Sequence, residues 1–205
     1  MTRTRNLGLA VLLCAAAAAC GDDTGTQATA AGPSLAGGAP LCVKFTPPPP
    51  GTIWGSPVGH VPGQLVHTEN AIDVLVQPFH WLGGGGSFNY AEIDLPPVAF
   101  GSGQVALTNN INLQFYFGNI TWIPTKVYFD YLDLGGHENL SVNGSAFYIG
   151  DIAAAPPVLG GRNVNVTSFP VFGGTTGRVT IWGGSIKHIT TGGQEYYIDN
   201  VCAVP

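Results

Sequence analysis

The sequence predicts an all-β fold, an antiparallel β-sandwich of the jelly-roll type, over residues 41–205. Short runs rich in β-branched and aromatic residues recur along this part of the chain and are separated by Gly, Pro and Asn. No segment keeps a helical period, and the runs GGGG at 83–86 and PPPP at 47–50 exclude a helix locally. About ten short strands with turn signals between them are typical of two packed sheets.

The expected strands are the β-rich runs bounded by turn residues. In chain order they cover 41–46, 72–82, 90–95, 104–117, 126–134, 139–144, 146–150, 162–169, 177–183, 185–190 and 195–204. The alternation of apolar and polar residues is clearest near the end of the fourth run, which predicts one buried and one wet face. The apolar face carries Ile111, Leu113, Phe115 and Phe117, and the polar face carries Asn110, Asn112, Gln114 and Tyr116.

The last run, within GGQEYYIDNVCAVP at 192–205, has the composition of a closing strand after a Gly-Gly turn. Ile198 and Val201 have opposite parity, so a flat strand cannot bury both on one face. A bulge at Asp199 and Asn200 would solve this and leave one polar group free to cap a turn or bind an ion. We expect the structural role for Asp199.

The first twenty residues have the pattern of an export signal. Arg3 and Arg5 precede an apolar run and an alanine-rich stretch, which predicts a signal peptide over residues 1–19. The stretch AAAC before GDD resembles the lipobox of bacterial lipoproteins. That resemblance implies lipidation of Cys20 and attachment to a membrane of the bacterial cell envelope, at the outer membrane or cell surface. Cleavage without lipidation, which would leave a secreted protein, is the alternative.

Residues 20–40 are mostly small and polar, without an apolar period, and are expected to be a flexible tether. Residues 41–205 are then one domain, long enough for a sizeable core.

The cysteines predict one disulfide bond. Cys14 leaves with the signal and Cys20 is the lipidation candidate, so Cys42 and Cys202 remain as a pair near the two ends of the domain. Disulfides persist in exported proteins, and this one would join the terminal strands. Antiparallel pairing through the two cysteines would place Asp199 opposite Phe45. Nothing resembles the paired Cys and His clusters of a zinc site.

The charge balance argues against nucleic acid as a partner. Arg3 and Arg5 leave with the signal, so 5 of the 7 basic residues remain against 12 acidic ones, a net side-chain charge of −7. Nucleic-acid binding requires a basic face.

Two segments resemble galactose-binding-like jelly-roll modules of exported bacterial proteins, a group that includes carbohydrate-binding modules. They are FDYLDLGGHENLSVNG at 129–144 and GRVTIWGGSIKHITTGGQEYYIDNVCAV at 177–204. The resemblance implies a sandwich that is often used to bind carbohydrate. It also implies a structural calcium held by the closing-strand acid, here Asp199, and a Glu of the first strand. The first strand offers Lys44 and Thr46 instead, so we expect no calcium there and no cofactor.

We find no complete catalytic constellation and expect a protein without enzymatic activity. Glu92 and Asp94 share a strand face as in family-16-type glycoside hydrolases, but Pro96 and Pro97 stand where the second Glu should fall. No GxSxG elbow occurs. The five histidines are scattered and are expected on surface loops; they are His60, His67, His80, His137 and His188. His67 and His137 could contribute metal ligands because acidic residues follow them closely in the sequence.

We expect an exported, lipid-anchored binding module for a glycan or another surface ligand. The carbohydrate-binding hypothesis depends on aromatic and amide side chains. Sugars stack on aromatic rings, and amides bind their hydroxyl groups. The candidate ligand-binding residues are Trp54, Trp81, Trp122, Trp182, Asn110, Asn112 and Gln114. The alternatives are that the tryptophans fill the core of a structural envelope lipoprotein without a small ligand, or that the protein is a divergent carbohydrate-active enzyme.

Overall fold

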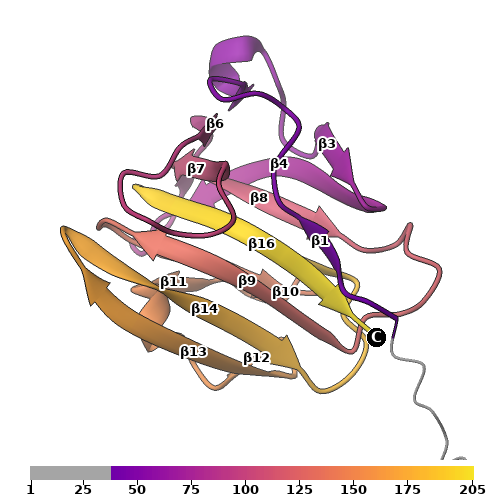
Figure 1. The fold of residues 1–205 in the computed structure, drawn as a ribbon. Helices are drawn as coiled ribbons and strands as arrows, with labels where there is room; N and C mark the ends of the chain where they lie inside the picture. Colours follow the sequence, from indigo (N-terminus) through magenta and orange to yellow (C-terminus); the bar gives the residue numbers. More distant parts are fainter. Residues whose placement is uncertain (1–37) are drawn as a thin grey trace, which may run out of the picture. The chain divides into compact units, whose positions relative to one another are not determined.

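The computed structural model describes residues 38–205, which form two antiparallel β-sheets packed into a sandwich (Figure 1). The predicted all-β class is therefore confirmed. The predicted signal peptide 1–19, the lipidation candidate Cys20 and most of the tether 20–40 lie outside the described residues. Within residues 38–205, no helix has the length and apolar character needed to cross a membrane.

The larger sheet has nine strands in the described part of the chain. They are β1 (Leu41–Val43), β2 (Ile53–Gly55), β6 (Tyr90–Asp94), β7 (Val105–Asn109), β9 (Lys126–Asp133), β12 (Val158–Leu159), β13 (Arg162–Val171), β14 (Gly174–Trp182) and β16 (Tyr196–Val204). Their order is β12-β13-β14-β9-β16-β7-β6-β2, and β1 pairs with β16.

The smaller sheet has seven strands in the described part. They are β3 (Leu65–Glu69), β4 (Ile72–His80), β5 (Gly86–Ser87), β8 (Ile111–Tyr116), β10 (Glu138–Val142), β11 (Tyr148–Gly150) and β15 (His188–Gly193). Their order is β11-β10-β15-β8-β4-β3, and β5 pairs with β4. The chain crosses repeatedly between the sheets, as in jelly-roll-like sandwiches. Two 3₁₀ helices, η1 (Ser56–Val58) and η2 (Ile152–Ala154), lie in the connections.

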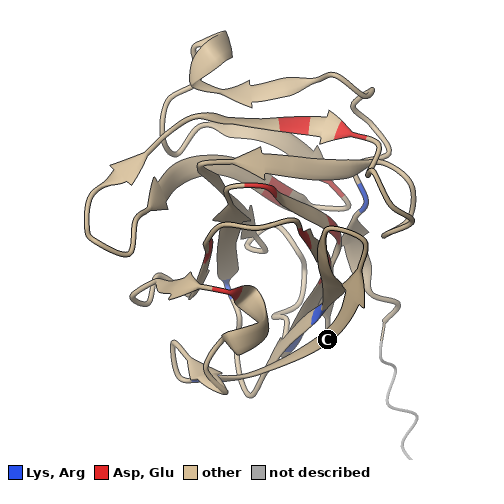
Figure 2. Ribbon diagram, turned by 90° about the vertical axis from the view of Figure 1, so that its left-hand side faces the viewer, with Lys and Arg blue, Asp and Glu red and all other residues tan. Residues whose placement is uncertain are grey.

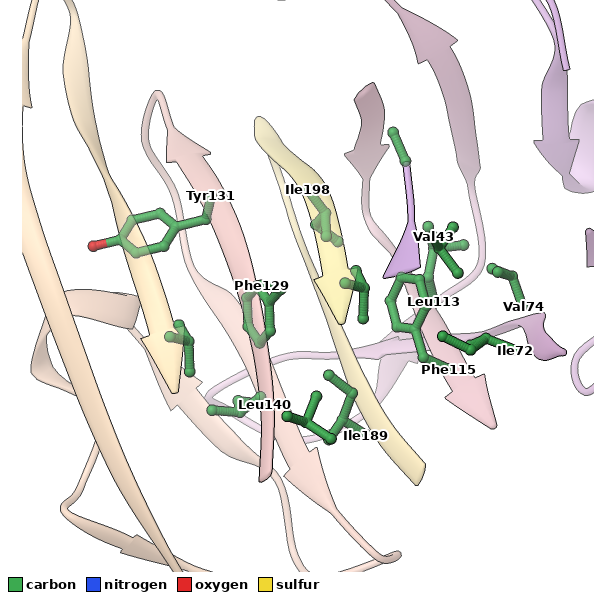
Figure 3. Close-up of a cluster of buried hydrophobic side chains, with 14 of the residues drawn as sticks. Val43, Ile72, Val74, Leu113, Phe115, Phe129, Tyr131, Leu140, Ile189 and Ile198 are labelled. Carbon is green, nitrogen blue, oxygen red and sulfur yellow. The ribbon is translucent and has the colours of Figure 1, made fainter. Parts of the chain in front are cut away.

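The core lies between the inner faces of the two sheets (Figure 3). Phe129 and Ile198 of the larger sheet meet Leu113, Leu140 and Ile189 of the smaller one, and all five are fully buried. Burial of an aliphatic or Phe side chain is worth about 1.5–3 kcal/mol, so this layer is the main source of the sandwich's stability. Charged residues are sparse along the described chain (Figure 2).

The expected strand 104–117 is wrong as a single element. It is two strands, β7 in the larger sheet and β8 in the smaller one, and Asn110 between them has φ 53°. Asn tolerates the left-handed region better than most residues, so the chain turns there from one sheet to the other. The Asn109-Asn110 pair was the available signal for this corner.

Strands β1 and β16 are joined by the predicted disulfide between Cys42 and Cys202. The ladder around it ends at the pair Val43 and Val201, so the expected pairing of Phe45 with Asp199 is wrong. The N–H groups of Lys44 and Phe45 donate instead to Glu69 Oε2, each at 3.1 Å. This carboxylate turns the chain away from β16 at the end of β1.

The predicted bulge in the closing strand is confirmed. The register between β16 and β9 shifts between Asp199 and Cys202, and Asn200 has φ 48°. The extra residue allows Ile198 and Val201 both to be fully buried.

Four short strands were not expected from the sequence: β2, β3, β5 and β12. Strand β3 lies at the edge of the smaller sheet, and its outer residue Leu65 is exposed. An edge strand with few buried side chains carries little of the alternation that marks a strand in a sequence.

Candidate functional site

The structure separates the four predicted tryptophans into buried, half-buried and exposed ones. Trp54 is 3% exposed in the core and stacks on His67, with ring centroids 5.9 Å apart. Trp81 is half-buried with its ring edge-on to Phe79, and Trp122 packs against the core. Trp182 is 38% exposed. Of the four, it is the one most open to a ligand.

Trp182 is the last residue of β14 and lies on the outer face of the larger sheet. Its neighbour Ile181 is fully buried in the core, and successive strand residues point to opposite faces. Thr180 therefore shares the outer face with Trp182. In the ladders, Trp182 lies opposite Lys126 of β9, and Thr180 lies opposite Asn165 of β13.

An open hollow of about 670 Å³ lies at this place, which we call the Trp182 hollow. It is lined by Thr125, Lys126, Asn165, Thr180, Trp182 and the Gly183–Gly184 turn. The lining combines one aromatic ring with an amide, two hydroxyls and an ammonium group. These are groups that can stack on and hydrogen-bond to a polyhydroxylated molecule.

The outer face continues beyond the hollow with a cluster of aromatic and charged side chains. Arg178 lies over the ring of Tyr128, 4.5 Å from its centroid, and donates two hydrogen bonds to Asp130 of 2.6 and 3.0 Å. Asn200 donates a further hydrogen bond to Asp130. These contacts link β14, β9 and β16 next to the hollow.

The three predicted amide residues do not join Trp182. Asn112 is fully buried and donates to the carbonyl of Pro78 and to Asn139 Oδ1, so the expectation of a wet face is wrong at this position. Asn110 occupies the corner between the sheets. Gln114 faces outward on the smaller sheet, where its Oε1 accepts from Gln77 Nε2 at 2.8 Å.

Gln114 lines another hollow, of about 200 Å³, on the smaller sheet, which we call the Gln114 hollow. Gln77, His80, Phe147 and His188 also line it. His80 and Phe147 pack with ring centroids 4.3 Å apart, and burial lowers the pKa of His188. The lining is polar. His80 covers one face of the Phe147 ring, so that face is not free to stack on a sugar.

Asp199 caps a turn, as the sequence suggested. Its Oδ2 accepts hydrogen bonds from the N–H and the hydroxyl of Ser102, at 2.5 and 2.9 Å. The side chain is fully buried, and burial raises its pKa. A Cβ at Gly101 would lie 2.3 Å from Oδ2, so this turn requires glycine beside the carboxylate.

Three other carboxylates form a cluster that the sequence did not reveal. Oxygen atoms of Asp133, Glu138 and Asp151 lie within 4.8 Å of one another. Glu138 is fully buried, and its pKa is raised to about 8 because of burial and the nearby charge of Asp133. Each residue can offer an oxygen ligand to a metal ion. Because Glu138 is inaccessible to a sugar, the cluster does not have the layout of a glycosidase site.

The cluster left a signal in the sequence. Asp133 continues the inward-facing parity of Phe129 and Tyr131, and Glu138 shares the parity of the buried Leu140. An acidic residue in a buried row is costly unless it has a partner. The earlier catalytic candidates Glu92 and Asp94 are half-buried on one face of β6, which is the wet face expected for them.

No model of a known protein family matches this chain, and no curated protein or solved structure is significantly similar to it.

Proposed function

We propose that the protein is a non-enzymatic binding module for a glycan and that the Trp182 hollow is its binding surface. The observation that carries the proposal is the exposed ring of Trp182 beside polar groups in an open hollow. Trp buries a large apolar area at a low cost in conformational entropy, because it has only two side-chain torsions. It therefore suits a surface that binds a ligand with small apolar faces, such as a sugar ring.

The rest of the lining supports a sugar over an apolar ligand. Asn165 offers an amide that can donate and accept hydrogen bonds, and Thr125 and Thr180 offer hydroxyls. Asn165 lies on β13, Thr180 on β14 and Thr125 just before β9, so the polar groups come from three neighbouring segments. Lys126 adds a positive charge, which favours a glycan that carries carboxylate or phosphate groups.

The proposed function is tested by screening the full chain on an array of bacterial and plant glycans. We expect binding to acidic or neutral polysaccharides, and we expect Trp182→Ala to weaken it about tenfold or more, equivalent to ~1.4 kcal/mol. Asn165→Ala should weaken it by a smaller factor, because one hydrogen bond is worth about 0.5–1.5 kcal/mol.

Phe172→Ala is the matched control. Phe172 is 95% exposed in the β13–β14 turn, at the other end of β14 from Trp182. Removing this ring tests whether any exposed aromatic supports binding. Equal loss in both aromatic variants, or no binding by the wild type to any glycan, would refute the assignment.

A structural envelope lipoprotein without a small ligand is the second candidate function. The observation in its favour is that Trp54 is a core residue and that Trp81 and Trp122 pack against other apolar side chains. In this case Trp182→Ala would leave every measured interaction of the protein unchanged.

A further inference from the structure

One end of the sandwich interior is polar rather than apolar. Tyr131 and Asp133 are inward-facing on β9, and Glu138 is inward-facing on β10 below the buried Leu140. The two carboxylates therefore approach each other from the two sheets, at the place where the apolar core ends. Asp151 joins them from the connection after β11, where its Oδ1 also accepts the N–H of Ala153 at the start of η2.

The three carboxylates have no cationic partner in the described residues. The two ion pairs found there join Arg178 to Asp130 and His67 to Glu69, on other parts of the sheets. Glu138 Oε2 accepts the N–H of Ile152 at 3.0 Å, which satisfies one of its two oxygens. Three acidic groups within 4.8 Å of one another repel unless a proton or a cation compensates their charge.

Three buried polar atoms around the cluster are also without hydrogen-bond partners. They are Glu138 Oε1, Thr191 Oγ1 and Tyr196 Oη, and all three side chains are fully buried. Tyr196 lies directly opposite Asp133 in the ladder, and Thr191 lies opposite Leu140, so both share the inner face with the acids. An unpartnered polar atom in a protein interior costs about 1–3 kcal/mol. Tyr196 is not acidic, and burial together with the charge of Glu138 raises the pKa of its hydroxyl, so this unpartnered group faces the acidic cluster and points to a polar ligand there.

We propose that Asp133, Glu138 and Asp151 form a binding site for a hard divalent cation, and that calcium is its physiological class of ligand. The donor set consists of carboxylate oxygens, with hydroxyl oxygens nearby, and contains no imidazole or thiolate in the cluster. Oxygen-only sites with several carboxylates suit calcium and magnesium and are poor sites for zinc or copper. Calcium is favoured over magnesium because it accepts irregular coordination from segments that are not arranged as an octahedron.

The site is distinct from Asp199 and from the Trp182 hollow. Asp199 satisfies one of its oxygens through Ser102 and does not belong to the cluster. Asp133 and Lys126 are the last and first residues of β9, so the cluster and the hollow lie at opposite ends of that strand. A cation would join β9, β10 and the η2 connection across the open end of the sandwich.

The experiment measures calcium binding to the full chain after treatment with EDTA and dialysis. We expect isothermal titration with CaCl₂ to show one saturable site per chain. We also expect Tm to rise by about 5–10 °C at a calcium concentration one hundred times Kd, because a ligand that binds only the folded state stabilises it. Magnesium at the same concentration should raise Tm less.

Two variants locate the site. Asp151→Asn keeps an oxygen that can cap η2 and alters an exposed residue, so this variant should fold while its calcium affinity falls at least tenfold. Glu138→Gln should abolish the calcium-dependent rise in Tm. Glu92→Gln, a Glu-to-Gln change on the outer face of β6, is the matched control and should bind calcium as the wild type does.

The proposal is overturned if the wild type shows neither a binding heat nor a change in Tm with calcium. It is also overturned if Asp151→Asn and Glu138→Gln retain wild-type affinity. The wild type could show no calcium effect while Glu138→Gln is more stable than the wild type. This result would show that a shared proton, and not a cation, compensates the negative charge of the cluster.

Discussion

Asp199 illustrates how a single buried carboxylate can be structural in an all-β protein. Its Oδ2 accepts two hydrogen bonds from Ser102, and this interaction attaches the 101–103 turn to the outer face of β16. Its Oδ1 is buried without a partner, and burial raises the pKa of the carboxyl group. The residue therefore organises the turn at a cost in desolvation.

The raised pKa of Asp199 predicts a pH dependence of stability. A carboxyl whose pKa is higher in the folded than in the unfolded state binds its proton more tightly when folded. Its contribution to stability is therefore greatest below the ordinary pKa of about 4 and falls as pH rises through the folded value. We expect the free energy of unfolding of the wild type, relative to Asp199→Asn, to decrease between pH 3 and pH 7.

Urea unfolding of both proteins across this range measures the difference, and Asp94→Asn is the control for a carboxylate on the wet face of β6. The opposite result would be a gain in stability of the wild type relative to Asp199→Asn as the pH rises. That result would mean that the hydrogen bonds from Ser102 outweigh the effect of burial.

At the scale of single residues, the sequence predicted roles that depend on neighbours along one strand. Asp199 could be assigned to a turn because the parities of Ile198 and Val201 required a bulge beside it. The burial of Asn112 could not be predicted, because its partners Pro78 and Asn139 come from other strands. The acidic cluster was missed for the same reason, since it joins three segments.

At the scale of elements, the disulfide between β1 and β16 connects the two ends of the described fold. Strand β1 has only three residues and pairs with β16 alone, so its backbone hydrogen bonds are few. The bond between Cys42 and Cys202 closes a loop across a sequence separation of 160 residues. Attachment of the first strand thus depends on the disulfide more than on the ladder.

We expect Cys42→Ala/Cys202→Ala to lower the free energy of unfolding by up to about 5 kcal/mol, the chain-entropy limit for a loop of this length. Denaturant unfolding of the variant and of the oxidised wild type measures this loss, and the reduced wild type should behave as the variant does. Equal stability of the variant and the oxidised wild type would show that β1 is held by its packing instead.

Among the elements, those with strong alternation and a clear turn at each end were predictable. The expected runs 126–134 and 195–204 correspond to β9 and β16 with differences of one residue at an end. The corner at Asn110 was missed because the alternation on both sides of it is continuous in the sequence. Edge strands such as β3 were missed because a strand with one neighbour and an exposed face need not alternate.

At the scale of the whole molecule, the sandwich keeps its two proposed sites apart. The Trp182 hollow is on the outer face of the larger sheet, and the acidic cluster lies between the sheets. Because they are at opposite ends of β9, a strand of 8 residues, they are separated by roughly 20 Å. The proposed cation site is therefore part of the scaffold, and the proposed glycan site is part of the outer face.

Recognition of glycans by the Trp182 hollow on the larger sheet is the proposal that most needs a direct test. An NMR titration of the full chain with pooled acidic and neutral oligosaccharides provides this test, following the indole N–H signals of the four tryptophans and the backbone amide signals. We expect the indole signal of Trp182 to shift in a saturable way, with smaller shifts at Asn165 and Thr180, while the indole signal of the buried Trp54 stays constant. Saturable shifts confined to the Gln114 hollow, or no shift with any oligosaccharide, would contradict the proposal.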